Sequence, residues 1–173
     1  MRDPLDLANR KRIFEFIRSS PGVHFREIQR RTRLPIGVLE YNLNYLVRKE
    51  LLSVERHDNF SRYYPSGQLS KEKQKILSVL RQEIPRGIVL YLLRNPGATH
   101  TELLDNFTIS GGTLSYHVKK LTIRGVVSAE KRGRESYLRV TDPDKVADLL
   151  IVYRRTFFDK LVDEFVARYI EHK

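Results

Sequence analysis

The apolar residues in the first third of the chain have helical spacing at first and strand-like spacing afterwards. Asp3-Pro4 predicts a helix N-cap with a proline in the first turn, and Pro21-Gly22 predicts the end of that helix. A second helix over residues 25–31 and a third over residues 36–49 are expected to follow. The inward sides of these three helices comprise Leu5, Ile13, Phe16 and Ile17, then Phe25 and Ile28, then Leu39, Leu43 and Leu46.

A hairpin and a linking helix are predicted next. Residues 51–55 and 61–64 have the composition of two strands around a polar turn at His57-Asp58-Asn59. Pro65-Ser66-Gly67 is a break, and Ser70 predicts the cap of a helix over residues 71–83. Its buried side is expected to comprise Ile76, Leu77, Leu80 and Ile84. Pro85 is expected to separate this helix from the next.

The same order of elements recurs after Pro85. A helix is predicted over residues 87–94, and Thr99-x-x-Glu102 is a capping box that opens another over residues 100–107. Ser110 predicts the cap of a third helix, and Gly125 has the position of a left-handed residue after it. The inward side of this third helix comprises Leu114, Val118 and Leu121. Strands over residues 126–131 and 135–140 flank the turn Arg132-Gly133-Arg134.

The two halves are copies of one module. Residues 11–61 align without a gap on residues 86–136 at a constant offset of 75, with 11 identities in 51 pairs. The identities include Pro21-Gly22 with Pro96-Gly97, and Glu27 with Glu102. The run Gly37-x-Leu39-x-Tyr41 also matches Gly112-x-Leu114-x-Tyr116. A period this long exceeds that of a solenoid repeat, so we expect each copy to bury its own core.

The last 32 residues continue an apolar stripe at helical spacing. Asp142-Pro143 repeats the cap-and-proline start, and we expect one long helix of about eight turns, roughly 40–45 Å at 1.5 Å per residue. Such a helix either forms a dimer or folds back across both repeats. We favour a dimer, as in regulators whose twofold symmetry matches a palindromic site. Its predicted interface comprises Leu150, Tyr153, Phe157, Phe158, Leu161 and Phe165.

Charge narrows the function. The chain has 173 residues and a formal net charge of +11, distributed as +5 over residues 1–70, +7 over 71–141 and −1 over 142–173. Basic repeats are typical of proteins that bind polyanions, although many solvated basic faces have no partner. There is no cysteine, which excludes thiolate nucleophiles and zinc fingers. No apolar run is long enough for a membrane span or a signal core, so we expect a cytoplasmic protein without membrane contact.

Catalytic motifs are missing from the sequence. Gly111-Gly112-Thr113 lacks the lysine and the flanking strand of a phosphate-binding loop, and no nucleophile elbow or spaced carboxylate pair is present. His117 has no sequence partner, and we expect it to be packed or adjacent to DNA. We therefore expect no enzyme, no cofactor and no metal site.

The motifs resemble the tandem winged-helix transcription regulators of archaea, relatives of the MarR and ArsR types. The matching stretches are residues 24–28 with 37–43, and residues 112–121 with the glycine and hairpin that follow; the resemblance covers residues 10–64 and 86–140. It implies a mainly α fold with small β-hairpin wings (α+β): two winged helix-turn-helix domains in tandem plus a long C-terminal helix. The predicted domains are residues 1–66 and 86–141, with a linker helix over 67–85 and the dimerisation helix over 142–173.

The resemblance also implies that each third helix lies in the major groove of double-stranded DNA and each wing touches the backbone or minor groove. In the second copy the outward residues suit this role, because small hydroxyl side chains reach base edges and lysines reach phosphate or guanine. These residues, with Gly112 beside them, are Thr113, Ser115, Tyr116, Lys119 and Lys120, and the wing adds Arg132 and Arg134.

The first copy is ambiguous. Its third helix presents an apolar and aromatic face, with Ile36, Val38 and Tyr45 outward, which suits a protein partner such as a basal transcription factor. The same face includes Glu40, Tyr41 and Asn44, which suit cytosine and adenine, and Arg48 at its end. Phosphate contacts are expected from Arg26, Arg30, Arg31, Arg33, Arg56 and Arg62.

Together these observations predict a sequence-specific regulator of transcription that binds double-stranded DNA as a homodimer. The alternative is a winged-helix adaptor in a transcription or chromosome complex, whose aromatic faces bind protein and whose charge is only solvated.

Overall fold

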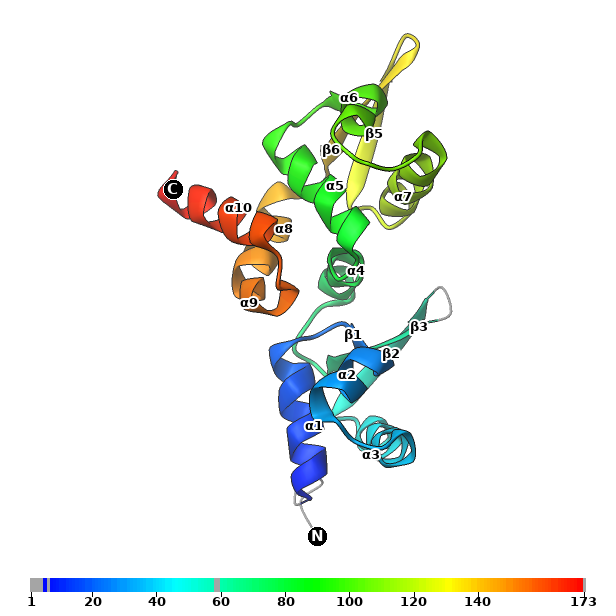
Figure 1. Ribbon diagram of the computed structural model, residues 1–173, viewed down its shortest axis with the longest axis vertical. Coiled ribbons are helices and arrows are strands. Elements are labelled where there is room, and N and C mark those ends of the chain that lie inside the picture. The colour runs from blue at the N-terminus through cyan, green and yellow to red at the C-terminus, as the bar shows by residue number, and fades with distance from the viewer. Residues whose placement is uncertain (1–4, 6, 58–59, 173) are drawn as a thin grey trace. The chain divides into compact units, whose positions relative to one another are not determined.

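The structure is a computed structural model that describes residues 5, 7–57 and 60–172. It divides the chain into two compact units, Met1–Ser78 and Val79–Lys173, and the boundary falls within α4 (Lys71–Leu80). Each unit contains three helices followed by a hairpin, in the order that the sequence predicts (Figure 1). The expected N-cap at Asp3-Pro4 lies outside the described residues, and the described helix begins at Ala8.

Unit 1 begins with α1 (Ala8–Ser19), β1 (Val23–His24), α2 (Phe25–Thr32) and α3 (Ile36–Arg48). The hairpin of β2 (Leu52–His57) and β3 (Phe60–Pro65), which we call the wing of unit 1, follows α3. The antiparallel sheet has the order β1-β3-β2. The two residues of β1 were not predicted as a strand, because so short a segment has no readable alternation.

The core of unit 1 is formed by the residues that the helical spacing places inward. The fully buried cluster comprises Ile13, Ile17, Val23, Ile28, Leu39, Leu43, Leu46 and Leu52. Phe25 and Phe16 pack against this cluster from its edge. The side of α3 opposite the leucines is exposed, so burial fixes which face of that helix is available to a partner.

Unit 2 repeats the architecture with α5 (Glu83–Arg94), β4 (Ala98–Thr99), α6 (His100–Asp105) and α7 (Gly111–Ile123). Its wing is the hairpin of β5 (Val127–Arg132) and β6 (Glu135–Val140), and its sheet has the order β4-β6-β5. The offset of 75 holds in three dimensions. The bounds of α3 and α7 differ by that number, as do the paired residues Val23↔Tyr63 and Ala98↔Leu138.

The predicted caps of unit 2 are confirmed. The Thr99 hydroxyl accepts from the Glu102 N–H while the Glu102 carboxylate accepts from the Thr99 N–H, which completes the capping box. The Ser110 hydroxyl accepts from the Thr113 N–H at the start of α7. The predicted start of the first helix at residue 87 is wrong, because α5 begins at Glu83 and Pro85 lies in its first turn. A proline is tolerated there, since the N–H groups of a first turn have no partner within the helix.

The prediction of a single long C-terminal helix is wrong. The tail forms α8 (Pro143–Val152), α9 (Arg154–Phe157) and α10 (Lys160–Glu171), and α10 folds back to contact α8 and α5 within unit 2. Phe158 ends α9 in the left-handed region at φ 53°, and Asp159 then caps α10 by accepting from the Leu161 N–H. The apolar spacing continues through this reversal, so periodicity alone does not reveal it.

Buried polar contacts hold the tail in place. The Arg86 guanidinium donates to the Asp159 carboxylate at 2.7 Å and to the Leu80 carbonyl at 3.0 Å. Arg81 donates to the Thr156 hydroxyl at 2.8 Å and lies over the Phe157 ring. Charge-assisted bonds of this kind are short and directional, so they fix the position of the α9–α10 corner. Among the helices of the described residues, none is long and apolar enough to cross a membrane.

The internal repeat supplies a matched test of backbone strain. Glu50 and Gly125 occupy equivalent positions after the third helices, at φ 58° and 71°. A left-handed residue with a side chain costs roughly 1–2 kcal/mol, part of which glycine loses again through its greater freedom in the unfolded chain. We expect Glu50→Gly to raise the free energy of unfolding by about 0.5–1 kcal/mol, and Gly125→Glu to lower it by a similar amount.

Urea unfolding followed by circular dichroism measures both variants. Glu50→Ala is the control, because it removes the carboxylate but keeps the strain, and it should leave the midpoint nearly unchanged. A gain in Glu50→Ala equal to that in Glu50→Gly would mean that the side chain, not the backbone, is unfavourable.

Candidate nucleic-acid interface

The outward side of α7 is an open surface of the second helix-turn-helix, α6–α7. Leu114 and Leu121 are fully buried, whereas Ser115, Tyr116 and Lys119 on the other side are exposed, Tyr116 by 57%. Of the remaining predicted residues, Thr113 and Lys120 are half-buried. This face begins at a helix N-terminus and presents a hydroxyl, an aromatic ring and a cation in succession.

Three contacts order this face. The Ser115 hydroxyl is 3.0 Å from Nε2 of His100, the first residue of α6. Lys120 donates to the Gln82 side chain at 3.4 Å, and the Thr113 and Ser110 hydroxyls are 2.9 Å apart. Lys119 is therefore the exposed cation of the face, while Lys120 is held back against its own unit. His100 was not among the predicted site residues, since its contact with Ser115 joins two helices and leaves no mark on sequence spacing.

His117 is packed, as one of the two predicted alternatives has it. The ring is half-buried, stands edge-on to Tyr116 at 5.1 Å between centroids, and its Nδ1 is buried without a hydrogen bond within the described residues. Burial lowers the pKa of His117, and the positive charge of Lys120 lowers it further. A neutral imidazole beside Tyr116 is consistent with a supporting role for the recognition face.

The wing of unit 2 presents two exposed arginines, of which Arg132 is paired. Arg132 donates to both oxygens of Glu130, at 2.9 and 3.1 Å, and its guanidinium lies 5.4 Å from the centre of the Tyr137 ring. The pairing lowers the pKa of Glu130 and raises that of Arg132. Arg134 lies exposed in the same tip beside Gly133, which has φ 64°. Arg134 is therefore better placed than Arg132 to meet a phosphate without first breaking an ion pair.

In unit 1 the outward side of α3 has a different chemistry. Tyr41 is 58% exposed, and Ile36 and Val38 are exposed beside it. The predicted contacts Glu40, Asn44 and Arg48 are exposed on the same helix. This face is apolar and mixed in charge, whereas that of α7 is polar and cationic.

A buried arginine ties α3 to α1. Arg10 donates through Nε to the Asn42 side-chain oxygen at 3.1 Å, and its guanidinium lies 3.5 Å from the centre of the Tyr45 ring. The Asn42 amide in turn donates to the Val38 carbonyl at 2.7 Å. Tyr45, predicted to face outward, is half-buried beneath this guanidinium. The second copy has Pro85 and His117 in place of Arg10 and Asn42, so this tie is specific to unit 1.

The arginines around α2 and the wing of unit 1 are exposed, with one correction. Exposed are Arg26, Arg30, Arg31, Arg33 and Arg56. Arg62 is buried, and its guanidinium donates to the Gly22 carbonyl at 2.8 Å. The prediction that Arg62 contacts phosphate is wrong, because this side chain satisfies a backbone acceptor in the turn before β1.

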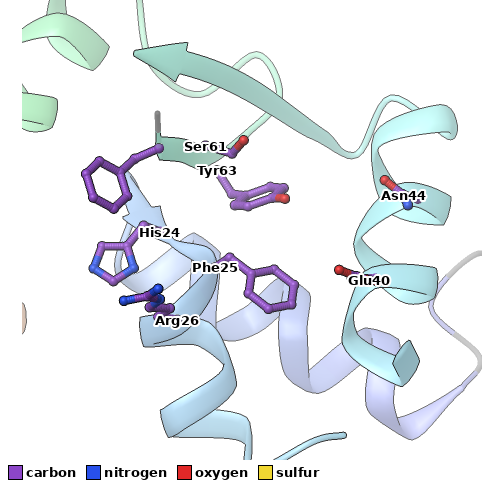
Figure 2. Close-up of a pocket in the computed structure, with 8 residues that line it drawn as sticks. His24, Phe25, Arg26, Glu40, Asn44, Ser61 and Tyr63 are labelled. Carbon is purple, nitrogen blue, oxygen red and sulfur yellow. The ribbon is translucent and has the colours of Figure 1, made fainter. Parts of the chain in front are cut away.

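A pocket of about 410 Å³ opens between α3 and the wing of unit 1. Its aromatic walls are Phe25, Phe60 and Tyr63, and its polar groups include Arg26, Glu40 and Asn44. Figure 2 shows the rings of Phe25 and Tyr63 at the centre, with Glu40 and Asn44 approaching from α3.

The tail presents fewer residues than predicted. Leu150, Phe157 and Phe165 are buried within unit 2, and Tyr153 is half-buried. They are therefore core residues rather than contacts for another chain, because α10 folds back over α8. Phe158 is 72% and Leu161 49% exposed, beside a second pocket of about 440 Å³ that Phe107 also lines.

Comparisons with known proteins agree with this architecture. Residues 7–77 match the model of an N-terminal HTH domain, and residues 81–128 match that of a winged helix-turn-helix DNA-binding domain. An uncharacterized HTH-type transcriptional regulator of Methanocaldococcus jannaschii is 27% identical over 124 residues, which are 72% of this chain and 31% of the relative. The chain therefore spans about a third of that relative.

Two crystal structures are also similar. Rv0081 of M. tuberculosis is 27% identical with a TM-score of 0.44, over 57% of this chain and 98% of that one. A possible transcriptional regulator for arsenical resistance is 31% identical with a TM-score of 0.39, over 54% and 95%. At these TM-scores the similarity transfers no function.

Two histidines at these faces make stability depend on pH. Burial lowers the pKa of both His24 and His117 below 6.5, and nearby cations lower it further. The unfolded chain therefore binds protons first as the pH falls. We expect the contribution of these two histidines to the free energy of unfolding to decrease from about pH 7 downward and to level off below their folded pKa values.

Imidazole NMR titration and urea unfolding at several pH values measure the two quantities. His117→Gln should reduce the decrease. A native pKa of 6.5 or above for His24 and His117 would contradict this expectation.

Proposed function

Since the chain contains two helix-turn-helix domains in tandem, the second of the winged DNA-binding type, we propose that it regulates transcription by binding double-stranded DNA sequence-specifically. The observation that carries this proposal is the outward side of α7, where Ser115, Tyr116 and Lys119 are exposed together at the start of a helix. The name of the archaeal relative supports regulation as the purpose of that binding.

In this proposal each group of the interface has a task. The first turns of α7 enter the major groove, where the Thr113 and Ser115 hydroxyls meet base edges and Lys119 meets a phosphate or a guanine. Arg134 at the tip of the wing contacts phosphate or a narrow minor groove. The formal charge of +7 over residues 71–141 attracts the duplex at long range.

Unit 1 adds a second DNA-binding surface. Glu40 and Asn44 face outward to meet cytosine or adenine, and the exposed arginines of α2 and its following turn supply phosphate contacts. The exposed Ile36, Val38 and Tyr41 favour a second candidate function, in which α3 binds a protein such as a basal transcription factor and the chain acts as an adaptor.

The tail is proposed to pair two chains. Phe158 and Leu161 are exposed apolar residues beside the second pocket, whose lining also includes Glu83 and Lys160. A patch that combines exposed apolar residues with both signs of charge can face a second copy of itself, as in an isologous dimer. A dimer would match a palindromic site.

Lys119→Gln tests the DNA interface. With a duplex recovered by selection from genomic fragments, we expect roughly three- to tenfold weaker binding and a salt slope reduced by about 1, because one phosphate contact is lost. Fluorescence anisotropy over a range of salt concentrations measures both. Lys73→Gln on α4 is the charge-matched control and should bind like the wild type.

The alternative function as a protein adaptor predicts a different result in these binding measurements. Equal affinity for selected and random duplexes, together with a Lys119→Gln variant indistinguishable from Lys73→Gln, would reject sequence-specific binding through α7.

Phe158→Asp and Leu161→Asp test the dimer. We expect each to weaken self-association at least tenfold, since a carboxylate would be buried in an apolar contact. Sedimentation equilibrium measures the constant, and the left-handed conformation of Phe158 is tolerated by aspartate. Val152→Asp, an exposed apolar residue of α8 outside the predicted interface, is the control. A wild-type chain that sediments as a monomer at high concentration would exclude the dimer.

A further inference from the structure

The residues that line the pocket of unit 1 are not shared with the second copy of the module. At the constant offset of 75, Phe60 corresponds to Glu135 and Tyr63 to Leu138, and Glu40 corresponds to Ser115. The same place in the fold therefore has aromatic walls and a carboxylate on the third helix in unit 1, whereas in unit 2 the equivalent carboxylate is Glu135 on the wing. The lining of this pocket is therefore specific to unit 1.

The walls suit a flat ring. Phe25 packs on the core with one side, and Phe60 is 51% exposed on the wing, with its ring 6.1 Å from that of His24. Tyr63 is half-buried between them and α3 (Figure 2). The volume of about 410 Å³ lies within the range of about 300–1,000 Å³ that small-molecule pockets occupy.

The end of the pocket next to α2 is electropositive and donates hydrogen bonds. His24 Nδ1 accepts from the Glu27 N–H, so the ring proton of the neutral imidazole is on Nε2. Burial lowers the pKa of His24, and the charges of Arg62, Arg30 and Arg26 lower it further. Arg26 is exposed in the lining of the pocket. This end is therefore suited to an anion.

The end next to α3 presents hydrogen-bond acceptors from Glu40 and Asn44. Burial raises the pKa of Tyr63, the charge of Arg56 lowers it, and the carboxylate of Glu40 raises it by less than Arg56 lowers it. Asn44 lies one turn after Glu40 on the same side of α3 and supplies both an acceptor and a donor. This end is suited to a ligand edge that carries N–H groups.

We propose that this pocket binds a guanine mononucleotide. The base lies against the aromatic walls, its N1–H and N2–H groups donate to the Glu40 carboxylate, and Asn44 completes the edge. Arg26 and the Nε2–H of His24 bind the phosphate. Glu40 and Asn44 are also the residues of α3 that are proposed to contact DNA bases, so nucleotide and DNA exclude each other at unit 1. This last step rests on the proposed function.

Isothermal titration calorimetry of the full chain with three probes tests the site. We expect a dissociation constant of about 1–100 µM for guanosine monophosphate. Guanosine lacks the phosphate, and adenosine monophosphate lacks the two adjacent N–H donors, so each should bind roughly tenfold more weakly. No saturable binding of guanosine monophosphate at about 1 mM would overturn the proposal, whatever the chain does with DNA.

Two variants assign the ends. Arg26→Gln should weaken guanosine monophosphate about tenfold and leave guanosine unchanged, and Glu40→Gln should remove the preference for guanine over adenine. Both residues are exposed, so neither variant is expected to unfold the chain. Thr101→Gln, the equivalent of Arg26 in unit 2, is the matched control and should bind all three probes like the wild type. Equal losses for guanosine and its monophosphate in Arg26→Gln would overturn the assignment.

Discussion

Burial of one side of the third helix is the constraint on which each unit depends. In unit 1 the side of α3 with Leu39, Leu43 and Leu46 closes a small apolar core, and the equivalent side of α7 closes that of unit 2. A core so small leaves no room to rotate the helix without exposing a leucine. Its opposite side contributes little to stability, so its chemistry is free to serve recognition, and the two copies have used that freedom differently.

Local signals made much of this fold predictable. The offset of 75, the inward leucines and the caps at Thr99 and Ser110 involve neighbours within a few residues or a direct repeat, and all are seen in the structure. The tail was not predictable in the same way. Its reversal depends on a left-handed Phe158 and on the Arg86–Asp159 pair, whose partners are 73 residues apart. A long-range polar contact leaves the apolar spacing of α8 and α10 unchanged.

The same distinction holds for the candidate site. Which side of α7 is exposed follows from its period, so Ser115, Tyr116 and Lys119 were recognised from sequence. What each side chain already contacts does not follow from it. Arg62 and Arg132 are of the residue type that binds phosphate. However, Arg62 donates to the Gly22 carbonyl and Arg132 pairs with Glu130. The sequence gives the number of arginines, whereas the availability of each guanidinium to a ligand depends on the acceptors that the fold brings near it.

Separate cores make divergence between the copies possible and give it a use. Since unit 1 and unit 2 each bury their own apolar residues, a change at Glu40 or Phe60 need not disturb α7. In the proposed function both units bind the same DNA, so once one has bound, the other would meet the DNA at a high effective concentration and their affinities would multiply rather than add. A ligand that occupies only the pocket of unit 1 would then remove that multiplication while α7 keeps its own contacts. Regulation of this kind lowers the occupancy of DNA as the pocket fills with ligand, and it does not require either unit to change shape.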